Sequence, residues 1–392
     1  MIKERFFRYV SYDTQSDENS ITIPSTLKQI DFAKVLKQEC EELFDTVELA
    51  NTGILYCFLD GDSTKDVIGL CAHMDTALEC SGANVKPREI KNYDGSIIQL
   101  NEQLSMDPER FTDLKSCIGD DLIVTDGTTL LGGDDKAGIA IIMETIEKIK
   151  DQNHGPISVA FTCDEEIGRG TDHFDLEKFP CAYAYTIDGD RIDNVEWENF
   201  NAAQSVVTIT GESIHPGSAK GKMVNASLLA MDYAKCIPNN QSPATTEARE
   251  GFYHLVQMSG DVEKAELVYI LRDHDRLKFE RKKAYMQEIC DALNDKYGNR
   301  FQVETKDQYY NMADFMKDHK PIEKAKEAIA SLKIEPVSIP VRGGTDGARL
   351  TEMGLPCPNL GTGTFNHHGR YEFASLNKME QMVEILTKIL ID

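Results

Sequence analysis

Five short segments carry side chains that could bind metal ions and move a proton. Each contains histidine or carboxylate side chains and lies just past the carboxyl end of a predicted strand: Ala72-His73-Met74-Asp75, Gly132-Gly133-Asp134-Asp135-Lys136, Asp164-Glu165-Glu166-Ile167-Gly168, Ile187-Asp188-Gly189 and His367-His368-Gly369. Two histidines and three carboxylates could hold two divalent cations if one carboxylate bridges them. Such a pair of ions, ~3.5–4 Å apart, is a recurring device for hydrolysing peptide bonds. In the Glu165-Glu166 pair, one glutamate could bind metal while its neighbour takes a proton from bound water.

Each segment also has an ordinary structural explanation when it is taken alone. A single histidine after a strand is more often structural, and Asp134-Asp135 before a helix could be an N-cap. Glu165-Glu166 could be a solvated pair and Asp188-Gly189 a turn. The recurrence of all five segments at strand ends favours the metal site, because loops at the carboxyl ends of strands in an open α/β sheet converge on one crevice. The residues alone leave both explanations open.

The elements that must position these side chains alternate between short apolar runs and helical patterns. The predicted strands of this part of the chain cover 67–71, 122–124, 157–161, 182–187, 337–339 and 357–360, and the predicted helices cover 137–149, 322–332 and 376–390. Strands separated by helices indicate an α/β domain with a mostly parallel sheet.

A different order of elements interrupts this pattern. The predicted elements are a strand at 206–210, a helix over 223–237, strands at 253–258 and 266–271, a helix over 275–297 and a strand at 301–304. The order βαββαβ is that of a ferredoxin-like fold. We therefore predict that residues 1–202 and 314–392 form the catalytic domain and that 203–313 form an inserted lid domain.

The composition excludes some classes of function. The chain has 392 residues, of which 41% are hydrophobic, with 66 acidic and 42 basic residues and a net charge of −24. Such a charge disfavours binding to nucleic acid or to anionic membranes, and no apolar run approaches the ~20 residues that a membrane-spanning helix needs. The ten cysteines include no Cys-x-x-Cys pair, which is typical of free thiols in a reducing compartment. We expect a cytoplasmic location.

Many further motifs occur in an order that resembles the M20 metallopeptidase family, and in particular its tripeptide aminopeptidases. The matching segments are 12–16 (Tyr-Asp-Thr-Gln-Ser), 72–76, 125–138, 164–168, 215–217 (His-Pro-Gly), 251–255, 272–273, 309–312 (Tyr-Tyr-Asn-Met) and 342–348 (Arg-Gly-Gly-Thr-Asp-Gly-Ala). The resemblance runs nearly from end to end, and it implies that the α/β domain is a zinc-peptidase-like catalytic domain. It implies hydrolysis of the first peptide bond of a tripeptide by a zinc-bridging hydroxide.

The resemblance also implies a role for each residue of the site. Two Zn²⁺ ions per chain are expected, with His73 and Asp188 on one ion, Glu166 and His368 on the other, and Asp134 bridging them. Glu165 matches the general base. Asp75 matches a carboxylate that orients the ring of His73, because a His-x-Asp sequence on extended chain places both side chains on one side.

Four residues outside the metal set are implied in contacts with the substrate. His215 matches a lid histidine that stabilises the oxyanion, Arg272 and Arg342 match residues that bind the substrate carboxylate, and Asn311 matches a further hydrogen-bonding group. A planar guanidinium suits bidentate carboxylate binding. Taken alone, each arginine would be read as a surface salt bridge, and His215 as a turn histidine before Pro216-Gly217.

Three positions depart from the family pattern. Cys163 stands where proline is common, Gly133 replaces alanine, and His367 stands where tyrosine is expected. The last change makes two histidines adjacent, and we choose His368 as the ligand because it keeps the His-Gly step of the family.

Two other functions stay open on the sequence alone. The chain could be an M20-type N-acyl amino acid deacylase or carboxypeptidase, which share the metal site, or a non-catalytic metal-binding or peptide-binding relative. The intact Glu165 argues against the last of these, since a binding protein needs no free carboxylate beside its metals. The expected partner is a small peptide substrate, namely a tripeptide. A homodimer of two copies of the chain is a further possibility.

Overall fold

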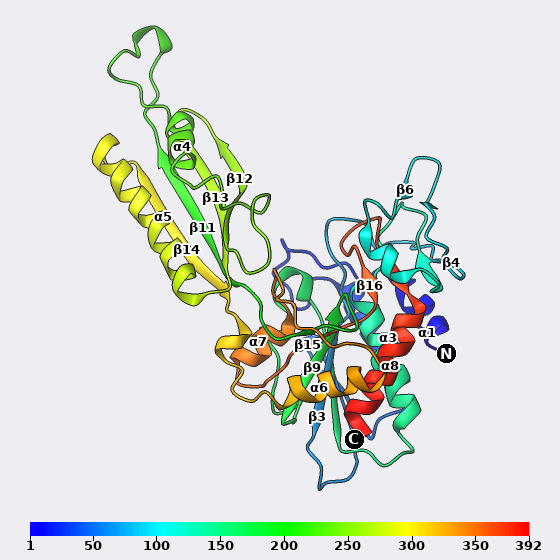
Figure 1. Cartoon of the computed structure of the whole chain (residues 1–392). Helices are drawn as coiled ribbons and strands as arrows, with labels where there is room; N and C mark the ends of the chain where they lie inside the picture. The colour runs from blue at the N-terminus through cyan, green and yellow to red at the C-terminus, as the bar shows by residue number, and fades with distance from the viewer. Residues whose placement is uncertain (392) are drawn as a thin grey trace. The chain divides into compact units, whose positions relative to one another are not determined.

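The computed structural model describes residues 1–391, which form two compact units. Unit 1 contains Met1–Trp197, Phe315–Ile339 and the described residues from Thr345 onward. Unit 2 contains Glu198–Asp314 and the short segment Pro340–Gly344, which is distant in sequence but packs with it. Both units are coloured along the chain in Figure 1.

Unit 1 is built on a mixed seven-stranded sheet. Its strands, in spatial order, are β1 (Thr46–Leu49), β2 (Leu55–Leu59), β8 (Ile157–Thr162), β3 (Ile68–His73), β9 (Tyr183–Gly189), β15 (Asn359–Gly361) and β10 (Val195–Glu196). The four central strands from β8 to β15 are parallel, whereas the other three pairings are antiparallel. The α/β class is confirmed, but "mostly parallel" describes only the middle of the sheet. Every residue of β3 and β8 is buried, as expected for central parallel strands covered on both faces.

Helices cover this sheet and each other. They are α1 (Ile2–Val10), α2 (Leu27–Cys40), α3 (Gly133–Ile149), α6 (Lys320–Ser331), α7 (Asp346–Glu352) and α8 (Leu376–Ile391). The apolar residues of α3 pack over β3 and β9, and α1 and α8 pack on α3 (Figure 1). A side chain at Gly138 would place its Cβ 1.9 Å from the carbonyl oxygen of Ile187. Glycine therefore permits the close approach of α3 to β9 and, with it, of Asp134 to Asp188.

Unit 1 also contains a second, smaller sheet, and two of the predicted strands differ from what the structure shows. Its strands lie in the order β16 (Thr364–Phe365), β17 (Phe373–Ser375), β7 (Leu122–Val124) and β4 (Arg88–Ile90), and a separate hairpin joins β5 (Ile98–Gln99) to β6 (Ser105–Met106). The run at 122–124 is thus a strand, but it is not part of the central sheet. The predicted strand at 337–339 is wrong, because Val337 forms only an isolated bridge with Asn194.

Unit 2 has the predicted βαββαβ order of elements. These are β11 (Asn201–Thr210), α4 (Ala226–Ala234), β12 (Phe252–Gly260), β13 (Lys264–Asp273), α5 (Arg276–Tyr297) and β14 (Phe301–Tyr309). The sheet is antiparallel in the order β12-β13-β11-β14, with α4 and α5 packed against it. Along β13 every second residue is buried, from Ala265 to Asp273, as a sheet covered on one face requires. The role of this unit as a lid stays a prediction.

Two features bear on the predicted location. Over residues 1–391, no helix combines enough length and apolar character to cross a membrane. All ten cysteines are free thiols, and seven of them are buried.

Candidate metal centre

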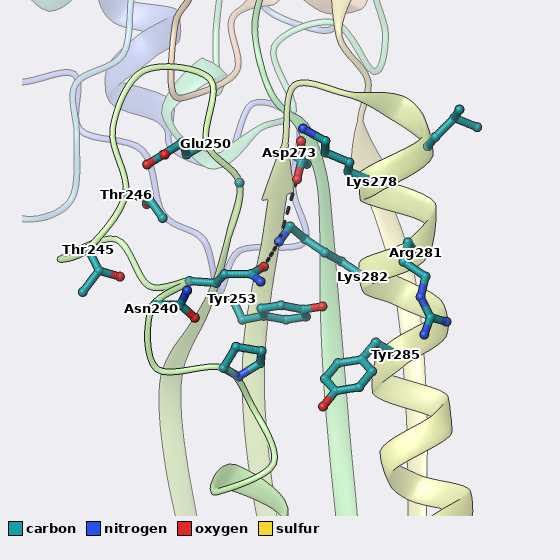
Figure 2. A pocket seen from close by; sticks show the side chains of 14 residues that line it. Asn240, Thr245, Thr246, Glu250, Tyr253, Asp273, Lys278, Arg281, Lys282 and Tyr285 are labelled. Atoms are coloured by element: carbon teal, nitrogen blue, oxygen red, sulfur yellow. Dashed lines mark hydrogen bonds and ion pairs between the residues drawn. The ribbon is translucent and has the colours of Figure 1, made fainter.

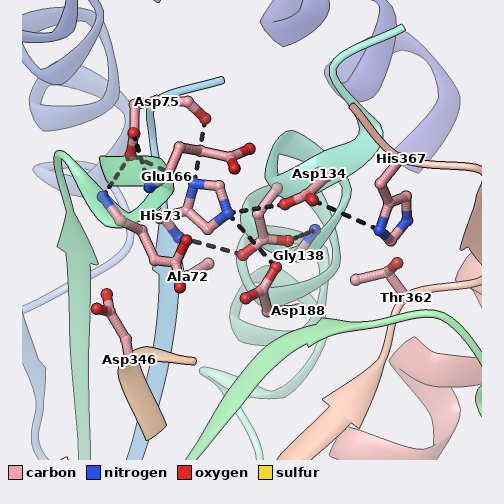
Figure 3. A network of polar contacts seen from close by, with 12 residues as sticks. Ala72, His73, Asp75, Asp134, Gly138, Glu166, Asp188, Asp346, Thr362 and His367 are labelled. Atoms are coloured by element: carbon pink, nitrogen blue, oxygen red, sulfur yellow. Dashed lines mark hydrogen bonds and ion pairs between the residues drawn. The ribbon is translucent and has the colours of Figure 1, made fainter. Parts of the chain in front are cut away.

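His73 brings two carboxylates from other elements to the end of β3. The ring is buried at the last position of the strand, and its Nε2 lies 2.8 Å from Asp134 Oδ1 and 3.4 Å from Asp188 Oδ1 (Figure 3). Asp134 comes from the first turn of α3 and Asp188 from the neighbouring strand β9. The contact among these three side chains follows from the parallel pairing of β3 with β9 and from the packing of α3 over both.

The other oxygen of Asp134 faces a second group of donors. His368 Nε2 lies 3.2 Å from Asp134 Oδ2 and 3.1 Å from Glu166 Oε2. Glu166 belongs to the short 3-10 helix η2 (Glu165–Ile167) after β8, and its side chain is only 4% exposed. The structure therefore brings together all five predicted ligands, with Asp134 between the two groups.

The donor set fits metal ions. Ligand atoms of His73, Asp134 and Glu166 lie within 4.8 Å of one another, as do those of His73, Asp135 and Asp188. Within residues 1–391, Glu166 Oε1 is buried and has no hydrogen-bond partner, although buried polar atoms are normally satisfied. A cation between these groups would supply the missing partner.

Two adjacent aspartates compete for the bridging position. The carboxylate oxygens of Asp135 already accept hydrogen bonds from the backbone N–H groups of His73 at 3.1 Å and Gly138 at 3.0 Å. Asp134 instead directs one oxygen to each group of donors. We therefore assign the bridge to Asp134 and a supporting role to Asp135.

The electrostatics also favour bound positive charge. Burial, together with the negative charge of Asp134, raises the pKa of Glu166 to about 7 and that of Asp188 to about 6. Burial also raises the pKa of Glu165 well above its ordinary value. Burial lowers the pKa of His73, but the surrounding carboxylates raise that pKa more, so the net shift is well upward. Carboxylates gathered out of water in this way are stabilised by cations.

Asp75 supports both the histidine and the glutamate pair. Its buried carboxylate has one oxygen 3.4 Å from His73 Nδ1. That oxygen, Oδ1, also accepts a hydrogen bond from the backbone N–H group of Glu165 at 3.0 Å, and Oδ2 accepts one from that of Glu166 at 3.1 Å. The predicted orienting role therefore extends to the backbone of the turn that carries Glu165.

Both adjacent histidines approach Asp134, but they differ in their other contacts. His367 Nδ1 lies 3.4 Å from Asp134 Oδ2 and 3.4 Å from Asp190 Oδ1, while its Nε2 pairs with Thr364 Oγ1 at 2.8 Å. Only His368 also reaches Glu166. This geometry supports the choice of His368 as the ligand.

Sequence reasoning missed Glu372, which supports Asp134. Its buried carboxylate accepts hydrogen bonds from the backbone N–H groups of Leu131 at 2.7 Å, Gly132 at 2.8 Å and Asp134 at 3.0 Å. The one signal in the sequence is a glutamate four residues after His368, directly before an apolar run. That signal is too common to identify a supporting residue.

Unit 2 contains the three predicted substrate-binding residues and the predicted catalytic histidine of the lid: Arg272, Arg342, Asn311 and His215. In this unit the guanidinium of Arg342 donates to the carbonyl oxygens of Ala248 and Glu250 and to Thr246 Oγ1, and it lies over the rings of Phe200 and Phe252. Arg272 donates to the carbonyl oxygens of Leu271 and Ala203.

The remaining two predicted residues, Asn311 and His215, differ in how exposed their side chains are. Asn311 is buried, and its amide is engaged by the backbone of Asn199, Ala313 and His274. His215 is exposed and caps the 3-10 helix η3 (Pro216–Ser218). Their contacts with substrate stay a prediction.

Unit 2 also contains a cavity of about 850 Å³ between α5 and the loop that precedes β12 (Figure 2). The side chain of Lys282 projects into it from α5, where Nζ lies 2.5 Å from Gln241 Oε1, 3.8 Å from Asp273 Oδ2 and 4.5 Å from the centre of the Tyr253 ring. The buried positive charge is thus already neutralised within the unit. The cavity contains none of the predicted metal ligands.

We expect Lys282→Met to destabilise unit 2. Removing the cation leaves the carboxylate of Asp273 buried without its partner, which costs about 3 kcal/mol. Urea denaturation followed by circular dichroism should show this loss. The matched control is Lys278→Met on the same helix and cavity wall, because Lys278 is exposed. Adding Asp273→Asn to Lys282→Met should restore part of the stability, and an unchanged single variant would contradict the pairing.

Comparisons with known proteins give consistent matches along the chain. Residues 129–392 match Peptidase family M20/M25/M40. A curated relative from Caldanaerobacter subterraneus subsp. tengcongensis, named Peptidase T, is 48% identical over 99% of this chain and 97% of its own length. The crystal structure of aminopeptidase PepT from Bacillus cereus covers 100% of this chain and 97% of its own, with a TM-score of 0.79 and 24% identity. A tripeptidase from Staphylococcus aureus gives a TM-score of 0.81 at 21% identity, with coverage of 100% and 97%. These two structures establish a shared fold.

Proposed function

The chain belongs to peptidase family M20, and from that premise we propose that it is a metal-dependent aminopeptidase that removes the N-terminal residue of tripeptides. The observation that carries this proposal is the free carboxylate of Glu165 beside a converged set of metal donors. The 48% identity to a Peptidase T over nearly the whole chain supports the substrate class, as do the names of the structural neighbours.

We propose two zinc ions as the cofactor. His73 and Asp188 would bind one ion, Glu166 and His368 the other, and Asp134 both. Histidine nitrogens and carboxylate oxygens are ordinary zinc ligands. Bound there, the ions would polarise the scissile carbonyl and lower the pKa of a water molecule.

The chain's own residues would manage the proton and hold the site in shape. Glu165 would accept the proton of the attacking water and deliver it to the departing amine, since its carboxylate has no hydrogen bond or ion pair within residues 1–391. Asp75 and Asp135 would hold the glutamate turn and the backbone of His73 in place. Arg272 and Arg342, which belong to unit 2, would bind the terminal carboxylate of the peptide and thereby select its length. His215 would help to stabilise the oxyanion, and Asn311 would contribute a further hydrogen bond to the substrate.

A comparison of three peptides tests this proposal. The zinc-loaded protein should hydrolyse a free tripeptide to an amino acid and a dipeptide, and it should act on the N-acetylated tripeptide at least about 100-fold more slowly, because a buried site built to bind an amine rejects a substrate that lacks it. Tetrapeptides should be poor substrates. Mass spectrometry of the products gives the cleaved bond. Preference for the acetylated peptide would indicate a deacylase, and release of the C-terminal residue would indicate a carboxypeptidase.

The cellular setting is a further proposal. Ten free cysteines support a reducing compartment such as the cytoplasm. The homodimer stays a prediction.

A further inference from the structure

The turn that carries Glu165 begins with an unusual backbone conformation. Asp164, the residue before the proposed general base, has a φ of 62°, in the left-handed region. Residues other than glycine rarely adopt this conformation and keep it only where the surroundings enforce it. The contacts of Asp164 identify what enforces it here.

The side chain of Asp164 is bound by the start of α2. Its carboxylate accepts hydrogen bonds from Ser25 N at 2.7 Å, from Ser25 Oγ at 2.5 Å and from Gln29 Nε2 at 2.7 Å. In return, Gln29 Oε1 accepts a hydrogen bond from Asp164 N at 3.0 Å. Ser25, Gln29 and Asp164 are all buried. One glutamine amide therefore binds both the backbone and the side chain of the residue before Glu165.

The same turn is held on its other side by Asp75. The N–H groups of Glu165 and Glu166 both donate to that carboxylate. Gln29 and Asp75 thus accept hydrogen bonds from three consecutive backbone N–H groups of the turn, those of residues 164 to 166. Gln29 does so from α2 on one side, and Asp75 from the segment after β3 on the other. The carboxylate of Glu165 has no hydrogen bond or ion pair of its own within residues 1–391, so the position of Glu165 depends on how its backbone is held.

We infer that Asp164 and Gln29 are positioning residues for the proposed general base. Their reciprocal hydrogen bonds hold the left-handed turn that carries Glu165, so they act on turnover through Glu165. Within residues 1–391, neither Asp164 nor Gln29 forms a hydrogen bond with a proposed metal ligand. This inference rests on the proposed function.

Two variants test whether the Asp164 carboxylate holds the turn, or whether residue 164 only needs to adopt a left-handed backbone conformation. Asp164→Gly keeps that conformation accessible and removes the carboxylate. Asp164→Asn keeps both the conformation and one acceptor oxygen. If Asp164 served only to permit the turn, glycine would replace it without loss.

The kinetic experiment uses the zinc-loaded chain and a free tripeptide. We expect kcat to fall about 10-fold to 100-fold in Asp164→Gly and in Gln29→Leu, because losing a supporting hydrogen bond of a site typically has that effect. KM should change less than about threefold, and Asp164→Asn should retain more activity than Asp164→Gly. The matched control is Gln38→Leu, since Gln38 is an exposed glutamine on the same helix. Wild-type kcat in Asp164→Gly or Gln29→Leu would overturn the inference.

Hydrogen exchange supplies a measurement that does not depend on activity. Amides of residues 164–166 should exchange faster in Gln29→Leu and Asp164→Gly, while the strand β3 stays protected and the zinc content stays that of the wild type. Unchanged exchange at 164–166 would also overturn the inference. If the wild type hydrolyses no tripeptide, the proposed function fails, but this second measurement still decides whether the two residues hold the turn.

Discussion

Glu165→Gln is expected to lose turnover while keeping its metal. The amide has nearly the shape of the carboxylate but cannot accept the proton of the attacking water. General acid–base groups contribute about 10²- to 10⁴-fold to rates, so kcat for a tripeptide should fall by about 10²- to 10⁴-fold. The variant should bind as much zinc as the wild type, because Glu165 is absent from the two donor groups.

Three measurements on the same samples separate this role from a loss of structure. Metal analysis by mass spectrometry gives the zinc content, isothermal calorimetry gives tripeptide affinity, and circular dichroism gives the melting temperature. Glu165→Ala should behave similarly, and Glu177→Gln, which replaces an exposed glutamate, should behave like the wild type. Full activity in Glu165→Gln would remove this residue from the mechanism.

The sequence predicted the ligand segments better than it predicted how they meet. His73, Glu166 and Asp188 follow or end the central strands β3, β8 and β9, and parallel strands bring such residues to one edge. Asp134 and His368 do not fit this argument. They follow β7 and β16, which belong to the smaller sheet, so their approach to His73 depends on long-range packing that periodicity does not encode.

Supporting residues were harder to predict than ligands. Glu372 and Gln29 act through hydrogen bonds to backbone groups more than 130 residues away, and neither residue type nor local spacing reveals such a contact. Asp75 is the exception, because it lies two residues from His73 on the same extended segment. A supporting residue can thus be predicted only where its partner is close in sequence.

Unit 2 was predictable for a different reason. Its strands are covered on one face, so β13 alternates between buried and less buried residues, and α5 places Phe279, Met286 and Ile289 on one buried face. Local patterns of this kind are visible in a single sequence. The short segment Pro340–Gly344 packs with this unit only through tertiary contacts, and no local pattern indicates that.

Asp134→Ala is expected to lower zinc binding and activity together. Among the five proposed ligands, Asp134 is the one with an oxygen toward each group of donors, 2.8 Å from His73 and 3.2 Å from His368. Its removal leaves each remaining group without its shared ligand. We therefore expect fewer than two zinc ions per chain after dialysis. We also expect a loss of kcat of at least about 10³-fold, since the two metal ions would together activate the attacking water.

The matched control is the neighbouring aspartate. In Asp135→Asn, the amide keeps one oxygen to accept a hydrogen bond from the backbone of His73 or Gly138, so this variant should keep two zinc ions and show at most a moderate loss of activity and stability. Metal analysis of both variants after the same dialysis decides between them. If Asp134→Ala kept two zinc ions and Asp135→Asn lost zinc, the bridging ligand would be Asp135. Both carboxylates have an oxygen within 4.8 Å of a ring nitrogen of His73. They differ because the oxygens of Asp135 already accept hydrogen bonds from backbone N–H groups.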